Sequence, residues 1–208
     1  MISICVFIWI RWTDRGYNEA MSAGKKLKEL IGDEDLYAYY SPYSRAAETL
    51  YAILEGGNLH RQTFTQIEDV RLIEQSFGNL QDPTEIAKEK QKRMKYGRYF
   101  FKFKDGESGL DVTLRATAFV DRLYDHFRTG YYSTHPEKEW NVLIVSHGLF
   151  MRVFVKCFLR RTVQDFLKWY NYANCELCVL NKEKDGTYTV CPTTPLPLAP
   201  RKREALND

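Results

Sequence analysis

Apolar residues in this chain fall into short continuous runs and helix-like spacings, separated by polar turns. Residues 142–145 (VLIV) form a continuous run that is typical of a strand buried on both faces. Ser146, His147 and Gly148 end this run before a second apolar segment begins. The pattern therefore predicts a strand that ends at His147, followed by a helix over 149–159.

The rest of the pattern alternates between strand-like and helix-like segments, as it does in α/β proteins. We expect a three-layer α/β/α sandwich with a mostly parallel central sheet and helices on both faces. In such a fold the functional site lies at the carboxyl ends of the strands. The predicted strands cover 2–10, 36–40 and 64–70, the predicted helices cover 15–31, a segment starting at Ser41-Pro42, 83–96, 111–127 and 162–170, and a final hairpin covers 175–180 and 187–191.

The length of the chain bounds its domain organisation. With 208 residues and 44% hydrophobic content, the chain can bury one sizeable core, and nothing in it demands a second. We expect a single domain over 1–191. The last segment, 192–208, is rich first in proline and then in charge, which predicts a mobile tail.

Charged residues are nearly balanced, with 30 Lys and Arg against 27 Asp and Glu and a formal charge of +3. This balance argues against nucleic acid as a partner. One segment, 88–104, nevertheless interleaves eight basic residues with five aromatic ones. It is either a solvated helix followed by packed aromatic side chains or a cationic rim that attracts an anionic substrate.

The five cysteines are odd in number and lack the spacing of a disulfide framework, which favours a reducing compartment. Cys175 and Cys178 have CxxC spacing. They fall in a predicted strand, where residues three apart point to opposite faces. We therefore expect ordinary buried thiols here, with neither a redox pair nor a metal site.

The N-terminal apolar segment, 1–12, lacks a basic leader and a small-residue cleavage site. Its apolar run is roughly half the length of a membrane span. Its β-branched and aromatic residues favour a buried strand. We expect a cytoplasmic protein that does not associate with membranes.

Three polar side chains follow predicted elements at what should be one edge of the sheet. Arg45 lies in the first turn of a helix, Glu74 lies just beyond a strand, and His147 ends the strand at 142–145. Each residue alone has a common structural explanation, as an ion pair, a solvated acid or a satisfied histidine. Together they favour phosphate chemistry, because a guanidinium and an imidazolium neutralise phosphate oxygens while a carboxylic acid protonates a leaving oxygen.

Three ordered segments carry a family resemblance: SPYSRAAET at 41–49, LIEQSFG at 72–78 and VLIVSHG at 142–148. With GES at 106–108, they resemble the phosphoglycerate mutase-like proteins of the histidine phosphatase superfamily in order and spacing. The resemblance implies the sandwich fold and phosphoryl chemistry on a small phosphorylated substrate. It also implies that no metal or nucleotide cofactor is needed.

The resemblance assigns a role to each matching residue. Arg45 would bind the transferred phosphoryl group, His147 would stabilise it, and Glu74 would donate a proton to the leaving alcohol. The backbone N–H of Gly148 would add an anion contact. The family's nucleophile is a histidine that becomes phosphorylated and is then hydrolysed.

That histidine is missing from this chain. The family has Arg-His-Gly at the end of the first strand, where this sequence has Arg11 and then Trp12. Arg11 can stand in for the motif's arginine and bind substrate. We expect a phosphatase fold with impaired turnover or, alternatively, a phospho-ligand-binding pseudoenzyme. The sequence leaves four questions open. These are whether the N-terminal segment is altered, which substrate is used, whether the reaction is that of a mutase or a phosphatase, and what the oligomeric state is. No motif would bring the remaining histidines to the site: His60, His126 and His135.

Overall fold

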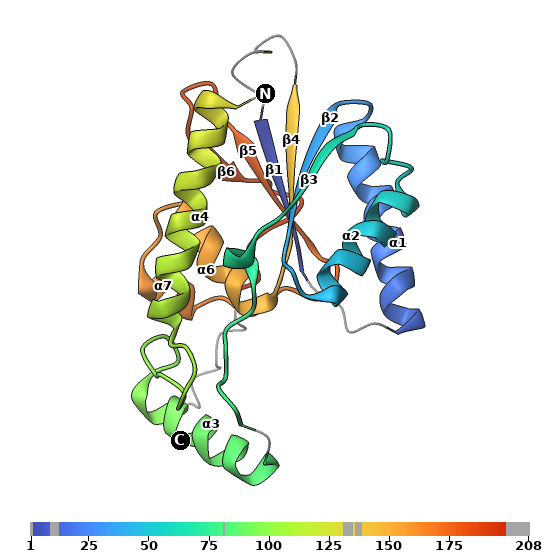
Figure 1. Ribbon diagram of the computed structural model, residues 1–208. Coiled ribbons are helices and arrows are strands. Elements are labelled where there is room, and N and C mark those ends of the chain that lie inside the picture. Colours follow the sequence, from blue (N-terminus) through green and yellow to red (C-terminus); the bar gives the residue numbers. More distant parts are fainter. Residues whose placement is uncertain (1, 9–12, 81, 131–134, 136–138, 199–208) are drawn as a thin grey trace, which may run out of the picture.

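The strands described in the computed structural model form one six-stranded sheet with the order β3-β2-β4-β1-β5-β6 (Figure 1). The structure describes residues 2–8, 13–80, 82–130, 135 and 139–198. Strands β3, β2, β4 and β1 run parallel, while β5 and β6 extend one edge in antiparallel fashion. The predicted mostly parallel sheet is confirmed. The strands are β1 (Ile2–Ile8), β2 (Asp35–Tyr40), β3 (Thr63–Glu68), β4 (Trp140–Ser146), β5 (Leu177–Lys182) and β6 (Tyr188–Val190).

Helices cover both faces of the sheet, and the three-layer sandwich is therefore confirmed (Figure 1). Helices α1 (Asp14–Ile31) and α2 (Ser44–Gly56) lie on one face. The other face carries α4 (Gly109–Thr129), α6 (Gly148–Phe158) and α7 (Val163–Leu167). A 3-10 turn, η1 (Val70–Leu72), follows β3.

The central position of β4 in the sheet explains why its sequence is continuously apolar. Val142 and Ile144 belong to the apolar cluster on the α4 and α6 face. Leu143 and Val145 belong to the cluster on the α1 and α2 face. Alternate side chains of a strand point to opposite faces, so a central strand covered on both sides needs an apolar residue at every position.

The end of α7 and the start of the C-terminal tail differ from their predicted positions, and the two hairpin strands are displaced by one or two residues. The helix predicted to continue to 170 ends at Leu167. Trp169 instead forms an antiparallel bridge with Leu198, and the N–H of Tyr170 donates to the carbonyl of Pro197 at 2.7 Å. Residues 192–198 therefore contact the body of the protein, and only 199–208 of the predicted tail lie outside the described residues.

The structure describes the N-terminal strand as β1 over Ile2–Ile8. The predicted continuation of this strand to residue 10 falls in residues 9–12, which lie outside the described part of the chain. Helix α1 begins after Thr13, whose side-chain oxygen accepts a hydrogen bond from the N–H of Gly16 at 3.0 Å, as predicted for an N-cap.

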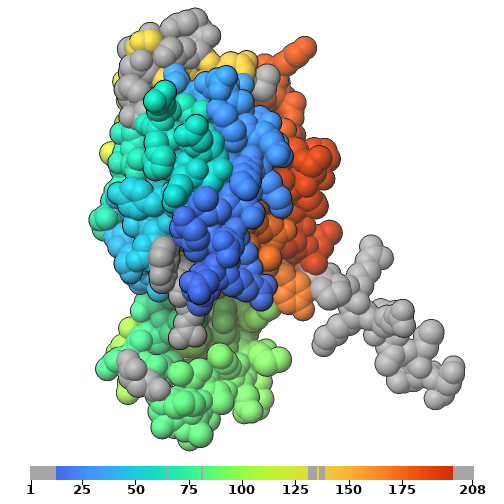
Figure 2. All heavy atoms as spheres, turned by 90° about the vertical axis from the view of Figure 1, so that its right-hand side faces the viewer, coloured from blue at the N-terminus to red at the C-terminus, as the bar shows by residue number. Residues whose placement is uncertain are grey.

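Helix α3 (Pro83–Tyr96) projects beyond the carboxyl ends of the parallel strands (Figure 1). None of its residues is buried, and Figure 2 shows it within a lobe that extends past the layered body. The side chain of Asp82 caps its first turn. The predicted solvated helix is confirmed, at the edge of the sheet where a site is expected. No helix among the described residues is long and apolar enough to cross a membrane.

Candidate functional site

Parallel pairing of β2 with β4 brings two predicted site residues together. Tyr40 pairs with Val145, and the N–H of Ser41 donates to the carbonyl of Val145 at 3.0 Å. The segments that follow the two strands therefore start side by side. Arg45 lies in the first turn of α2 and His147 directly precedes α6. Their side chains meet, with 3.4 Å between Nη2 of Arg45 and Nδ1 of His147.

His147 is fully buried, and its ring contacts a hydroxyl as well as a guanidinium. Its Nε2 lies 2.8 Å from Oγ of Ser41. A guanidinium can only donate, so Nδ1 accepts from Arg45 and the ring proton resides on Nε2. Burial, followed by the charges of Arg45 and Arg115, lowers the pKa of His147 to about 3. The imidazole is therefore neutral near pH 7.

Tyr43 supports both of these side chains. The guanidinium carbon of Arg45 lies 4.5 Å from the centre of the Tyr43 ring, within range of a cation–π contact. The same ring lies 5.1 Å from the imidazole of His147. The aromatic ring thus places a cation beside a neutral imidazole at the carboxyl edge of the sheet.

Glu74 lies at the N-terminus of α6. One carboxylate oxygen accepts from the N–H of Leu149 at 3.4 Å, and the other accepts from the N–H of Phe150 at 3.3 Å. The N–H of Gln75 donates to Glu74 at 2.9 Å. His147, the N-cap residue of α6, makes no side-chain capping bond. Glu74 therefore provides the negative charge that the start of this helix favours.

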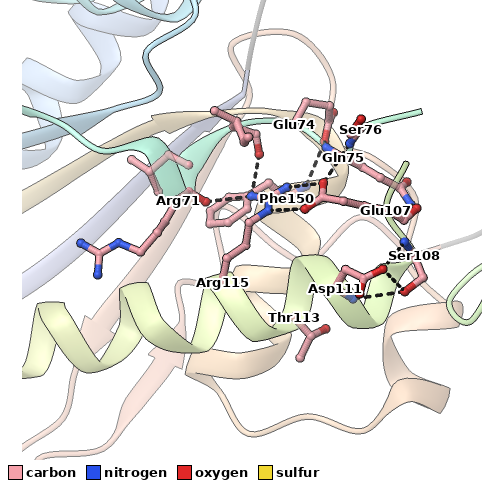
Figure 3. Close-up of polar contacts among 12 residues, drawn as sticks. Arg71, Glu74, Gln75, Ser76, Glu107, Ser108, Asp111, Thr113, Arg115 and Phe150 are labelled. Carbon is pink, nitrogen blue, oxygen red and sulfur yellow. Dashed lines mark hydrogen bonds and ion pairs between the residues drawn. The ribbon is translucent and has the colours of Figure 1, made fainter. Parts of the chain in front are cut away.

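A partly buried ion pair between Arg115 and Glu107, shown in Figure 3, holds the segment that leads to Glu74. Two nitrogens of Arg115 donate to the Glu107 carboxylate at 2.9 and 3.1 Å. Its Nη1 donates to the carbonyls of Arg71 and Ile73 at 2.7 and 2.8 Å. The Arg115–Glu107 pair thus fixes the backbone immediately before Glu74.

Glu107 fixes the backbone on the other side as well (Figure 3). Its carboxylate accepts from the N–H of Ser76 at 2.9 Å, and its carbonyl accepts from the side-chain amide of Gln75 at 2.8 Å. The N–H of Glu107 in turn donates to the carbonyl of Ser76 at 2.8 Å. Glu74 is therefore held between two anchored backbone segments.

The other predicted positions fall in different places. Gly148 is the first residue of α6, and a Cβ there would lie 3.0 Å from the side-chain nitrogen of Asn171. Arg11 and Trp12 lie outside the described residues. His126 lies on α4 and hydrogen-bonds the hydroxyl of Tyr39.

The structure describes both cysteines of the CxxC pair. Cys175 and Cys178 are both buried and free, and Cys175 precedes β5 instead of lying within it. Burial raises the pKa of the Cys175 thiol to about 12 and that of Cys178 to about 11. Among the described residues, no group of three His, Cys, Asp or Glu side chains could hold a metal ion.

Sequence reasoning missed several residues that build the site. Ser41 and Tyr43 lie in the same motif as Arg45, so the motif itself could have indicated them. Glu107 lies in the GES segment at 106–108, which contributed to the family resemblance but was given no role in the site. Arg115 carried no sequence signal, because its contacts with Glu107 and the 71–73 backbone depend on how α4 packs.

The arrangement has a defined chemical capacity. It combines a guanidinium, a neutral imidazole with a donor N–H, and a carboxyl group at a helix N-terminus. These groups can bind an oxyanion and exchange a proton with an ester oxygen.

Comparison with known proteins gives a consistent result. A sequence model of the histidine phosphatase superfamily (branch 1) matches residues 10–193. The phosphoglycerate mutase-like protein AT74H of Arabidopsis thaliana is 34% identical over 186 residues, which are 85% of this chain and 66% of that protein. The broad-range acid phosphatase DET1 of Saccharomyces cerevisiae is 32% identical over 121 residues, which are 56% of this chain and 34% of that protein. The chain thus spans less than two thirds of the length of both curated relatives.

Solved structures share the fold. The mycobacterial glucosyl-3-phosphoglycerate phosphatase superposes with a TM-score of 0.67 at 17% identity, over 91% of this chain and 96% of that one. At this identity the likeness establishes the architecture alone.

Proposed function

The chain belongs to the histidine phosphatase superfamily, branch 1, and on that basis we propose that it binds phosphomonoesters but turns them over poorly. In this proposal Arg45 and the N–H of Gly148 bind the phosphoryl oxygens, His147 stabilises their charge, and Glu74 protonates the leaving oxygen. Arg11 contributes a further cation. The observation that carries the proposal is the 3.4 Å contact between Arg45 and His147 beside the anchored Glu74.

The charge state of the site supports anion binding. His147 is neutral in the unliganded protein, since its pKa is lowered to about 3 by burial and by two guanidinium groups. A bound phosphate would place negative charge beside the ring and favour its protonated form. Binding would therefore raise the pKa of His147 above its value in the unliganded protein.

Poor turnover follows from the sequence at Trp12. The superfamily uses a histidine at that place as its nucleophile, and a tryptophan ring has no lone pair suited to attack phosphorus. Deleting the nucleophile of a covalent mechanism costs about a millionfold in turnover, whereas positioning and charge stabilisation retain on the order of a thousandfold over water. The pocket would thus bind phosphate esters and hydrolyse them slowly.

Two measurements on the purified protein test this proposal. Titration calorimetry should show saturable binding of inorganic phosphate that Arg45→Ala weakens by at least tenfold, while Arg61→Ala, at an exposed position of a loop, leaves it unchanged. Hydrolysis of p-nitrophenyl phosphate should be near background. Fast hydrolysis that His147→Ala abolishes would refute the proposed impairment and require a different nucleophile.

A second function, a phospho-ligand-binding module without chemistry, uses the same pocket. The observation that favours it is again the combination of an intact Arg45–His147 contact with the loss of the nucleophile. The two functions differ in one result: the module shows phosphate binding with no His147-dependent hydrolysis at all, whereas an impaired enzyme shows a slow reaction that His147→Ala removes. A cytoplasmic location stays a prediction from the sequence.

A further inference from the structure

The lobe formed by α3 and the segment after it, residues 83–104, concentrates positive charge on one part of the molecule. It carries eight Lys and Arg residues against two acids, Glu85 and Glu89, which is a formal charge of +6. The whole chain has a formal charge of only +3, so the rest of the chain carries −3. The lobe extends past the layered body, as Figure 2 shows. A projecting cationic surface is therefore attached to a body of opposite net charge.

Helix α3 presents most of this charge to solvent. Its partly buried residues are Ile86, Glu89 and Arg93, which recur at the spacing of a single helical face, and this face turns inward. Every other residue of the helix is exposed. Lys90 and Lys95 are among them, and neither forms an ion pair with a described residue. The exposed side of the helix is therefore available to an anionic partner.

Large apolar side chains are exposed on the same lobe, at the end of α3 and just after it. Met94 is 79% exposed, Tyr96 is 71% exposed and Phe100 is 54% exposed. Apolar and aromatic side chains interleaved with lysines are typical of segments that lie in the interface of a bilayer, where the apolar groups enter the acyl boundary and the lysines contact anionic headgroups. A nucleic acid would satisfy the lysines and stack on the aromatic rings, but it offers no apolar environment to Met94. The exposed apolar residues therefore favour a lipid surface.

We propose that the α3 lobe, residues 83–104, is a peripheral membrane-binding surface that docks on a leaflet containing anionic lipids. The sequence predicted no membrane association because its apolar N-terminal run is too short to span a bilayer, whereas binding at the surface requires no spanning segment. Docking through the lobe does not involve Arg45 or His147. It goes beyond the proposed function and can fail independently of it.

Co-sedimentation of the full chain with lipid vesicles tests the proposal. Vesicles of equal parts phosphatidylserine and phosphatidylcholine should pellet the protein, whereas vesicles of phosphatidylcholine alone should leave most of it in solution. Salt at about 0.5 M should weaken the binding, because it screens the lysines. Lys90→Gln combined with Lys95→Gln should weaken it roughly fivefold for each lysine removed. Lys25→Gln combined with Lys26→Gln is the matched control, which removes the same charge from exposed positions of α1 and should leave binding unchanged.

A second pair of variants tests the apolar contribution. Met94→Ser should weaken vesicle binding several-fold, and the loss should persist at high salt, since burial of an apolar side chain is not screened. Leu30→Ser is the matched control, because Leu30 is an apolar residue of α1 that is 48% exposed on another part of the molecule. It should bind vesicles as the unmodified protein does.

Three results would overturn the proposal. The first is no binding to the anionic vesicles, or an equal loss in the two double lysine variants. The second is tighter binding to single-stranded DNA than to vesicles, with no effect of Met94→Ser, which would identify a nucleic-acid surface. The third is loss of vesicle binding in Arg45→Ala, which would place the lipid headgroup in the phosphate pocket. Vesicle binding without binding of inorganic phosphate would instead refute the proposed function and leave the membrane-binding lobe standing.

Discussion

Replacing Arg115 with methionine should destabilise the fold and release the backbone around Glu74. The change removes four hydrogen bonds, two to Glu107 and one each to the carbonyls of Arg71 and Ile73. The side chains of Arg115 and Glu107 are only 15% and 22% exposed, so the abandoned carboxylate stays mostly out of water. Breaking a fully buried pair costs roughly 3–5 kcal/mol, whereas an exposed pair contributes about 0–1 kcal/mol, and this partly buried pair lies between these limits. We expect about 3 kcal/mol here.

The assay combines a global and a local measurement. For a domain of this size, about 3 kcal/mol corresponds to a fall in Tm of roughly 6–12 °C. Amide hydrogen exchange should rise most in peptides that cover 71–78 and the start of α6, because those N–H and carbonyl groups depend on Glu107 and Glu74. Arg128→Met serves as the matched control, since Arg128 lies on the same helix, is 76% exposed and pairs with Asp125 at 3.6 Å. Equal Tm values for the two variants, or a rise in hydrogen exchange that is uniform across the protein, would refute the reasoning.

Three further outcomes follow from individual contacts. The pKa of His147 is about 3 in the folded protein and 6.5 when unperturbed. As the pH falls below 6.5, the unfolded chain therefore binds a proton at His147 that the folded protein does not, and the folded protein loses stability between pH 6.5 and pH 3. Urea denaturation should show about 2 kcal/mol less stability at pH 5 than at pH 7 from this residue, a dependence that His147→Gln removes; an unchanged dependence contradicts it. Gly24→Ala should lower Tm by several degrees, since its Cβ would lie 2.1 Å from the carbonyl oxygen of Ile53, while alanine at an exposed position of the same helix should not; equal Tm values would disprove the clash. Ellman's reagent should label Cys191 before Cys178, whose buried thiol has its pKa raised to about 11, and the reverse order would count against the packing of β5.

The fold was largely predictable because its signals are local. The apolar run at 142–145 specifies a strand covered on both faces, and Thr13 specifies the start of a helix through its own side chain. The end of α7 was not predictable in the same way. Its last turn is replaced by pairing between Trp169 and Leu198, which are far apart in sequence, and no local pattern reports such a contact.

The site residues also divide into those that local sequence patterns predict and those that depend on tertiary packing. Arg45 and His147 could be predicted because each follows a strand of one parallel sheet, and parallel strands bring their carboxyl ends to a common edge. Arg115 could not be predicted in this way. It lies within a helix that the sequence marks as a packing element, and its role depends on which backbone groups that helix brings near.

The functional weight of a residue depends on whether the fold already accounts for it. Glu74 has a structural role in this protein, because its carboxylate accepts hydrogen bonds at the start of α6, where the side chain of His147 provides no capping bond. A chain that had lost its activity would still benefit from that carboxylate. The presence of Glu74 alone is therefore weaker evidence for retained activity than the contact between Arg45 and His147.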